Sequence, residues 1–212
     1  MAWNSNKIKQ QQELNLGLIK EEKPKTHRRK SALLERSNKH IYKRAHSEMQ
    51  LLNILDDKKL KRNTTYNFIT SGDIDSLSFL NLALRTYKTI DHLLFSTWCM
   101  AGEDILYLFD LVDAGIIKKM DCYLGEIFPN SYKIEWALIK EKYKQNPTLG
   151  RVTVFKNHSK IFAAIDENNN GFSIQSSANI NTNPRTENAA INTDTESYYF
   201  YKEYFDGINS FI

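Results

Sequence analysis

Five side chains in the second half of the sequence have the residue types that a phosphodiester-cleaving site needs. His158 and Lys160 stand two residues apart, Ser177 and Asn179 repeat that spacing, and Glu187 follows. An imidazole is a competent nucleophile near neutral pH, and a carboxylate on one ring nitrogen fixes the tautomer that exposes the other. Fixed cationic and amide donors stabilise charge on the transferring phosphoryl oxygens. The five residues therefore indicate attack on a phosphodiester, with no metal or other cofactor required.

A hairpin would bring the two halves of this motif together. Lys156–Ile165 is typical of a half-buried strand, which would place the histidine and the lysine on one face. Asp166–Gly171 has strong turn chemistry, and Phe172–Ser177 can return antiparallel. Folding about this turn predicts that His158 lies opposite roughly Ala178 to Ile180.

The combination His-x-Lys, turn, Ser-x-Asn and downstream Glu-Asn resembles the phospholipase D superfamily, in particular its small single-motif nuclease-like members. The resemblance implies that His158 attacks phosphorus and forms a covalent phosphohistidine. It implies that Lys160 and Asn179 hold the non-bridging oxygens. Ser177 and Glu187 would then support the site, the glutamate by orienting a histidine.

The chain departs from the family pattern at two positions. The family has an aspartate five residues after the lysine, where this chain has Ile165, with Asp166 one residue late. It also has a glycine before the serine, where this chain has Ser176. The aspartate is largely structural in the family and serine is small, so we expect the fold to accept both changes.

The sequence contains no second His-x-Lys. Chains with one motif resemble those family members that pair two copies across a symmetric dimer. We therefore predict a homodimer in which two His158 side chains face each other near the twofold axis, one as nucleophile and one as general acid.

Charge divides the 212 residues into a basic arm, residues 1–62, and a mildly acidic domain, residues 63–212. The arm has 16 Lys and Arg against 7 Asp and Glu, whereas the domain has 13 against 18. A basic cluster gains affinity for a polyanion by releasing counterions, which favours nucleic acid, and DNA in particular, as partner. A solvating tail or a docking segment for an acidic partner is the alternative. The candidate nucleic-acid-binding residues are Lys23, Lys25, Arg28, Arg29, Lys30, Arg36, Lys39, Lys43 and Arg44.

Several classes of protein and site are disfavoured. No run approaches the about 18 apolar residues of a membrane helix, and the N-terminus lacks the apolar core of a signal peptide. We therefore expect no membrane partner and a cytoplasmic location, in a cell or with a virus. Cys99 and Cys122 are expected to be buried free thiols. The histidines of the arm lack ligand partners at metal-binding spacing, and His92 is expected to be structural.

Strands that alternate with helices, followed by a late hairpin, predict an α/β fold, a mixed sheet flanked by helices on both faces. A capping box, Thr193-x-x-Glu196, predicts the start of a C-terminal helix whose six aromatic residues are more typical of core and dimer contact than of base stacking. The expected strands are 66–70, 93–98, 116–124, 151–155, 160–165, 172–175 and 189–192, and the expected helices begin at 75 or 76, 102 and 131.

Two functions follow from this reading. The first is a metal-independent phosphodiesterase, a nuclease-like enzyme acting on nucleic acid as a homodimer. The second is a catalytically silent protein of the same fold that binds nucleic acid or has a structural role, as in a phage or other mobile element.

Overall fold

The computed structural model describes residues 43–55, 58–180 and 185–210. The chain divides into two units, residues 1–43 and 44–212. The predicted arm ended at residue 62, but residues 44–62 belong to this second unit. Residues 43–54 are helical, and Leu51 and Leu60 are buried in the core of the unit. The predicted cations at positions 23–39 lie outside the described residues.

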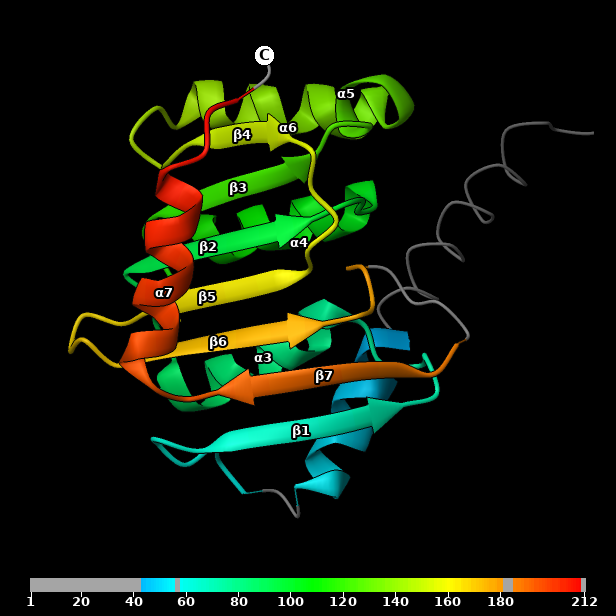
Figure 1. Ribbon diagram of the computed structural model, residues 1–212, viewed down its shortest axis with the longest axis vertical. Coiled ribbons are helices and arrows are strands. Elements are labelled where there is room, and N and C mark those ends of the chain that lie inside the picture. Colours follow the sequence, from blue (N-terminus) through cyan, green and yellow to red (C-terminus); the bar gives the residue numbers. More distant parts are fainter. Residues whose placement is uncertain (1–42, 56–57, 181–184, 211–212) are drawn as a thin grey trace, which may run out of the picture. The chain divides into compact units, whose positions relative to one another are not determined.

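One seven-stranded mixed sheet organises the unit (Figure 1). The strand order is β1-β7-β6-β5-β2-β3-β4. β2, β3 and β4 run parallel, and the pairs β2–β5, β5–β6, β6–β7 and β1–β7 are antiparallel. The strands are β1 (Thr65–Thr70), β2 (His92–Thr97), β3 (Met120–Gly125), β4 (Val152–Phe155), β5 (Ile161–Ile165), β6 (Gly171–Ser176) and β7 (Glu187–Asn192).

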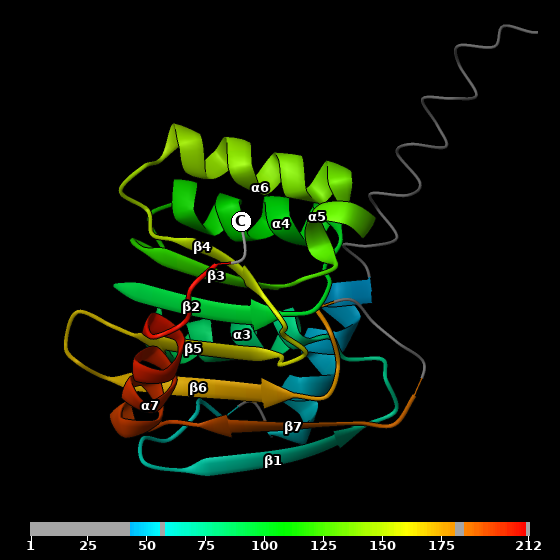
Figure 2. The ribbon, with the colours of Figure 1, turned by 45° about the horizontal axis from the view of Figure 1, so that its top comes forward.

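Helices cover both faces of the sheet, as predicted. The helices are α3 (Ser76–Tyr87), α4 (Gly102–Asp113), α5 (Phe128–Ser131), α6 (Lys133–Gln145) and α7 (Thr195–Asp206). Figures 1 and 2 show α3, α4 and α6 behind the sheet and α7 across its front. The alternation of side chains along β2 explains this layering. Leu93 and Phe95 face the large rear core, and Leu94 between them faces the smaller core under α7.

Capping residues set the helix starts. Asp75 caps α3 by accepting from Ser78 N at 2.8 Å, and α4 has the predicted start. The predicted N-cap of the last helix was wrong by one residue. Asp194 caps α7 by accepting from Ser197 N at 2.7 Å, whereas Thr193 Oγ1 donates to Lys61 O at 2.6 Å. A longer-range bond therefore takes the hydroxyl that the capping box required.

The residues expected to be structural have that role. Cys99 and Cys122 are buried, and neither forms a disulfide bond. His92 lies between Tyr198 Oη, 2.7 Å from Nδ1, and Asp121 Oδ2, 3.0 Å from Nε2. Of the helices in the described part of the chain, none has the length and apolarity needed to cross a membrane.

Candidate active site

Three antiparallel strands bring the two halves of the motif to one end of the sheet. The hairpin register pairs Ile161 with Gln175, and Ser176 N donates to Lys160 O at 3.0 Å. β7 continues the ladder, since Ser177 N donates to Asn188 O at 2.9 Å. The start of β5, the end of β6 and the start of β7 therefore adjoin, as the predicted turn requires (Figure 1).

The histidine and the lysine lie in a connection, not in a strand. β4 ends at Phe155 and β5 begins at Ile161, so the predicted strand over Lys156–Ile165 was wrong in its first half. Lys160 Nζ nevertheless lies 2.9 Å from His158 Nδ1 and donates to His158 O at 2.6 Å. The lysine side chain folds back toward the histidine. The connection between β4 and β5 therefore brings the two side chains into contact, whereas the sequence predicted that they would share one face of a strand.

This contact has a consequence for the imidazole. An ammonium group only donates, so Nδ1 of His158 is the acceptor, and a neutral ring then has its proton on Nε2. His158 is exposed, whereas Lys160 is 7% exposed. Burial lowers the pKa of Lys160, and the nearby Cys99 and Glu187 act in the opposite direction. A poorly hydrated cation beside an exposed imidazole is well placed to bind an anion.

Asn157 fixes the connection to the sheet. Its side chain is buried, and its Nδ2 donates to Ser96 Oγ at 2.8 Å and to Tyr123 O at 3.1 Å. Its Oδ1 accepts from Ser159 N at 2.9 Å and from Ser159 Oγ at 2.7 Å. The bond to Ser159 N is an Asx turn, which positions the residues on either side of the histidine. Sequence reasoning missed Asn157, although an asparagine directly before His-x-Lys was an available turn signal.

Trp98 supports the imidazole from the end of β2. The two ring centroids lie 5.2 Å apart with an interplanar angle of 46°. Gly125, at the end of β3, leaves room for this indole. A Cβ on Gly125 would lie 2.7 Å from Trp98 Cδ1 and 3.0 Å from Asn157 O, both closer than van der Waals contact. Gly125 was not singled out from the sequence.

Glu187 bonds a different partner from the one that the resemblance implied. Its Oε2 accepts from Ser177 Oγ, and that hydroxyl oxygen also accepts from Asn188 N at 3.0 Å. Among the described residues, His158 and Glu187 share no hydrogen bond. The serine and the glutamate are thus paired, and Glu187 acts on the site through its charge near Lys160.

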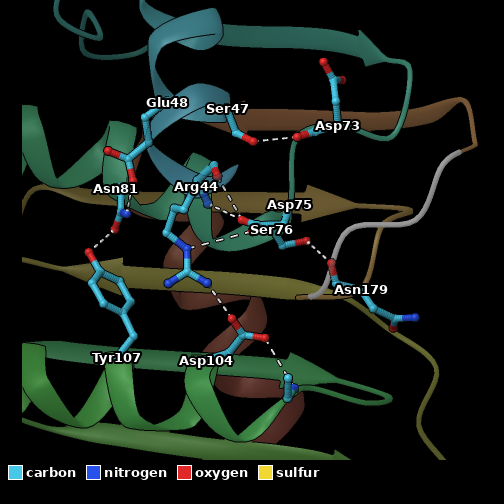
Figure 3. Close-up of polar contacts among 12 residues, drawn as sticks. Arg44, Ser47, Glu48, Asp73, Asp75, Ser76, Asn81, Asp104, Tyr107 and Asn179 are labelled. Carbon is cyan, nitrogen blue, oxygen red and sulfur yellow. Dashed lines mark hydrogen bonds and ion pairs between the residues drawn. The ribbon is translucent and has the colours of Figure 1, made fainter. Parts of the chain in front are cut away.

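Asn179 is held by its backbone. Ser76 Oγ donates to Ala178 O at 2.8 Å and reaches Asn179 O at 3.3 Å (Figure 3). The side-chain Oδ1 of Asn179 is buried and has no hydrogen-bond partner within the described part of the chain. Buried polar atoms of this kind are normally satisfied, so this amide oxygen is a candidate acceptor for a donor group of a ligand. At the position before Ser177, Ser176 Oγ accepts from Ala178 N at 3.0 Å and so shapes the same turn.

Arg44 is engaged inside the unit (Figure 3). Its Nη2 lies 2.5 Å from Asp104 Oδ1, and its Nε lies 3.9 Å from Asp75 Oδ2. Both carboxylates are buried, and burial raises the pKa of Asp75. Because these carboxylates already neutralise the guanidinium, we leave Arg44 out of the candidate nucleic-acid interface. Lys43 is exposed.

The family's aspartate position lies at the far end of β5. Ile165 pairs with Gly171 and His92 in the sheet. Asp166, one residue later, closes the hairpin: its Oδ1 accepts from Asn168 N at 2.9 Å and from Asn170 N at 2.8 Å. The aspartate therefore has a structural role from the shifted position. No cluster of three or more His, Cys, Asp or Glu in residues 43–55, 58–180 and 185–210 is placed to hold a metal ion.

No family model and no curated protein sequence matches the chain. Solved structures match its fold. Nuc, a phospholipase D family member from Salmonella typhimurium, is 12% identical with a TM-score of 0.48, over 68% of this chain and 91% of Nuc. Phosphatidylserine synthase from Haemophilus influenzae is also 12% identical with a TM-score of 0.48, over 67% of this chain and 37% of the synthase.

Yeast tyrosyl-DNA phosphodiesterase is 10% identical with a TM-score of 0.33, over 49% of this chain and 26% of that protein. The chain thus spans well under half of the synthase and of the yeast enzyme. At these identities and scores the likeness concerns the fold alone.

Proposed function

We propose that this chain is a phosphodiesterase acting on nucleic acid through a covalent phosphohistidine at His158. The observation that carries the proposal is the contact of a buried lysine with an exposed histidine, at the sheet end where Asn179 also lies. His158 and Lys160 are in contact, and Asn179, 21 residues after His158, follows the strand that pairs with β5. Such convergence is the usual signature of a catalytic site.

Substrate binding prepares the nucleophile in this mechanism. Lys160 turns from His158 Nδ1 to a non-bridging phosphate oxygen, since a phosphate is a stronger acceptor than an imidazole nitrogen. Nδ1 can then hold the ring proton, which leaves the Nε2 lone pair free to attack. Lys160 and the Asn179 amide stabilise the charge on the phosphoryl oxygens.

Two displacement steps follow. Nε2 bonds to phosphorus while the bond to the leaving oxygen breaks, and that oxygen takes a proton from the partner subunit's His158. Water then attacks phosphorus, the phosphorus–nitrogen bond breaks, and the water proton returns to the partner's His158. General acid help of this type is worth about 10²–10⁴-fold in rate. A homodimer is therefore part of the proposal, because the described site of one chain supplies one histidine.

The basic segment is proposed to hold the nucleic acid. Lys23, Lys25, Arg28, Arg29, Lys30, Arg36, Lys39 and Lys43 would contact phosphates without reading sequence, and DNA remains the favoured polymer. Removing residues 1–42 should weaken DNA binding and flatten its dependence on salt. The deletion stops short of Arg44, which the folded unit needs.

Cleavage of labelled single- and double-stranded DNA in excess EDTA tests the proposal. His158→Ala should abolish cleavage, and His46→Ala, which removes an exposed histidine from the helical residues 43–54, should leave it unchanged. Equal cleavage by both variants would refute the assignment of His158.

A silent relative of such enzymes is the second candidate. It is favoured by the pairing of Glu187 with Ser177, which leaves His158 without a carboxylate partner among the described residues. This candidate predicts no cleavage by the wild-type protein or by either variant, together with salt-sensitive DNA binding by all three.

A further inference from the structure

A pocket of about 340 Å³ opens directly beside the candidate nucleophile. Phe155, the last residue of β4, and Ile161, the first residue of β5, line it together with Phe200 and Tyr204 of α7. His158 and Lys156 line it as well. One residue, His158, therefore belongs both to the phosphate site and to this pocket.

Two aromatic side chains of α7 are presented to this pocket. Phe200 is 68% exposed and Tyr204 is 62% exposed. They stand four residues apart and so share one helix face. Tyr201 and Phe205, which are buried between α7 and the sheet, support them with ring centroids 5.1 and 5.2 Å away. Contacts with these buried rings therefore hold the two exposed rings in position.

The remaining lining suits an anionic ligand. The described residues around the pocket include no Asp or Glu, whereas Lys156 is an exposed cation and His158 an exposed imidazole. Asn157 and Ser159 complete the polar side. An aromatic wall that meets a cationic, carboxylate-free wall is complementary to a nucleotide, which has a planar base and a negative phosphate. A purely apolar ligand would leave the polar wall unused.

We propose that this pocket binds an unpaired nucleobase next to the scissile phosphate, with the base stacked on Phe200 and Tyr204. The inference rests on the proposed function and narrows its substrate to single-stranded nucleic acid or an extruded nucleotide. A base can stack on a side chain only when it has left its own pair, and each stacked base contributes measurably to binding with little dependence on sequence. The sequence had favoured a dimer contact for these exposed aromatics.

The test compares two fluorescent single-stranded probes of equal length, oligothymidylate and an abasic oligomer with the same sugar–phosphate backbone. Wild type is compared with Phe200→Ala/Tyr204→Ala and with Phe200→Leu/Tyr204→Leu, which keeps apolar area without rings. Tyr199→Ala is the matched control, because Tyr199 is 51% exposed on the same helix but does not line the pocket.

Both double variants should bind oligothymidylate about 10- to 100-fold more weakly, bind the abasic oligomer like wild type, and keep the wild-type circular dichroism spectrum. Unchanged binding of oligothymidylate, or an equal loss on both probes, would overturn the proposal. So would a change from dimer to monomer in sedimentation with unchanged affinity per chain, since the rings would then be covered by a second copy. Binding is measured without turnover, so an inactive protein with base-dependent binding would refute the catalytic proposal and leave this one standing.

Discussion

Removal of the Asn157 side chain should release the connection that holds His158. In Asn157→Ala, the Ser96 hydroxyl and the Tyr123 carbonyl lose a donor, and the Ser159 N–H and hydroxyl lose their acceptor. A typical hydrogen bond contributes about 0.5–1.5 kcal/mol net, and a buried group left without a partner costs about 1–3 kcal/mol. These four bonds, each 3.1 Å or shorter, to a side chain that is 5% exposed therefore predict a loss of about 3 kcal/mol in the free energy of unfolding.

Urea unfolding followed by circular dichroism measures this loss. Asn168→Ala is the matched control, because Asn168 is exposed in the hairpin turn and its replacement should change the free energy of unfolding by less than about 0.5 kcal/mol. The two variants should also differ in their rates of DNA cleavage at low denaturant: Asn157→Ala should be strongly impaired and Asn168→Ala should cleave at the normal rate. A stability within about 1 kcal/mol of wild type, with normal cleavage, would refute the role given to Asn157.

Three further changes probe neighbouring parts of the structure. Gly125→Ala should reduce kcat, because its methyl group displaces Trp98 from His158, and the loss in kcat should be larger than the loss in the free energy of unfolding can explain. Kinetics and urea unfolding of the same preparation separate the two effects. An unchanged kcat would contradict this prediction. Since burial lowers the pKa of Lys160, the unfolded chain binds more protons than the native one between the native pKa and 10.5. Wild-type stability relative to Lys160→Met should therefore rise with pH across that window, whereas a pH-independent difference in urea unfolding would show that the native pKa is ordinary. Arg44→Ala should lower the free energy of unfolding, measured in urea, by about 3–5 kcal/mol, because it removes a cation that contacts the buried Asp104 and Asp75. The exposed Arg85→Ala on α3 should cost almost nothing, and equal losses would contradict the burial argument.

Local patterns predicted the elements that place the site. The turn chemistry of Asp166–Gly171 predicted a hairpin with His158 opposite roughly Ala178 to Ile180, and the observed bond from Ser176 N to Lys160 O agrees with the first register of that range. The predicted helix starts at 75 or 76 and at 102 agree with α3 and α4, which begin at Ser76 and Gly102. These features depend on interactions between residues close in sequence.

Features that depend on distant contacts were missed. Asn157 bonds residues 61 and 34 positions away, and nothing in the local sequence identifies Ser96 or Tyr123 as its partners. A compositional count puts the arm boundary at residue 62, because the charges of residues 44–62 outweigh two buried leucines, whereas these residues group with the second unit. Thr193 matched a capping box, but its hydroxyl bonds the chain near β1.

The most direct test of the account is to trap the covalent intermediate. Wild-type protein, His158→Ala and His46→Ala would each be mixed with single-stranded DNA in excess EDTA and quenched in alkaline detergent, which preserves phosphohistidine. Mass spectrometry of the peptides would then locate any attached nucleotide. The account predicts a nucleotide joined to His158 in wild type and in His46→Ala, and none in His158→Ala. Cleavage that persists in His158→Ala, or an adduct on another residue, would contradict it.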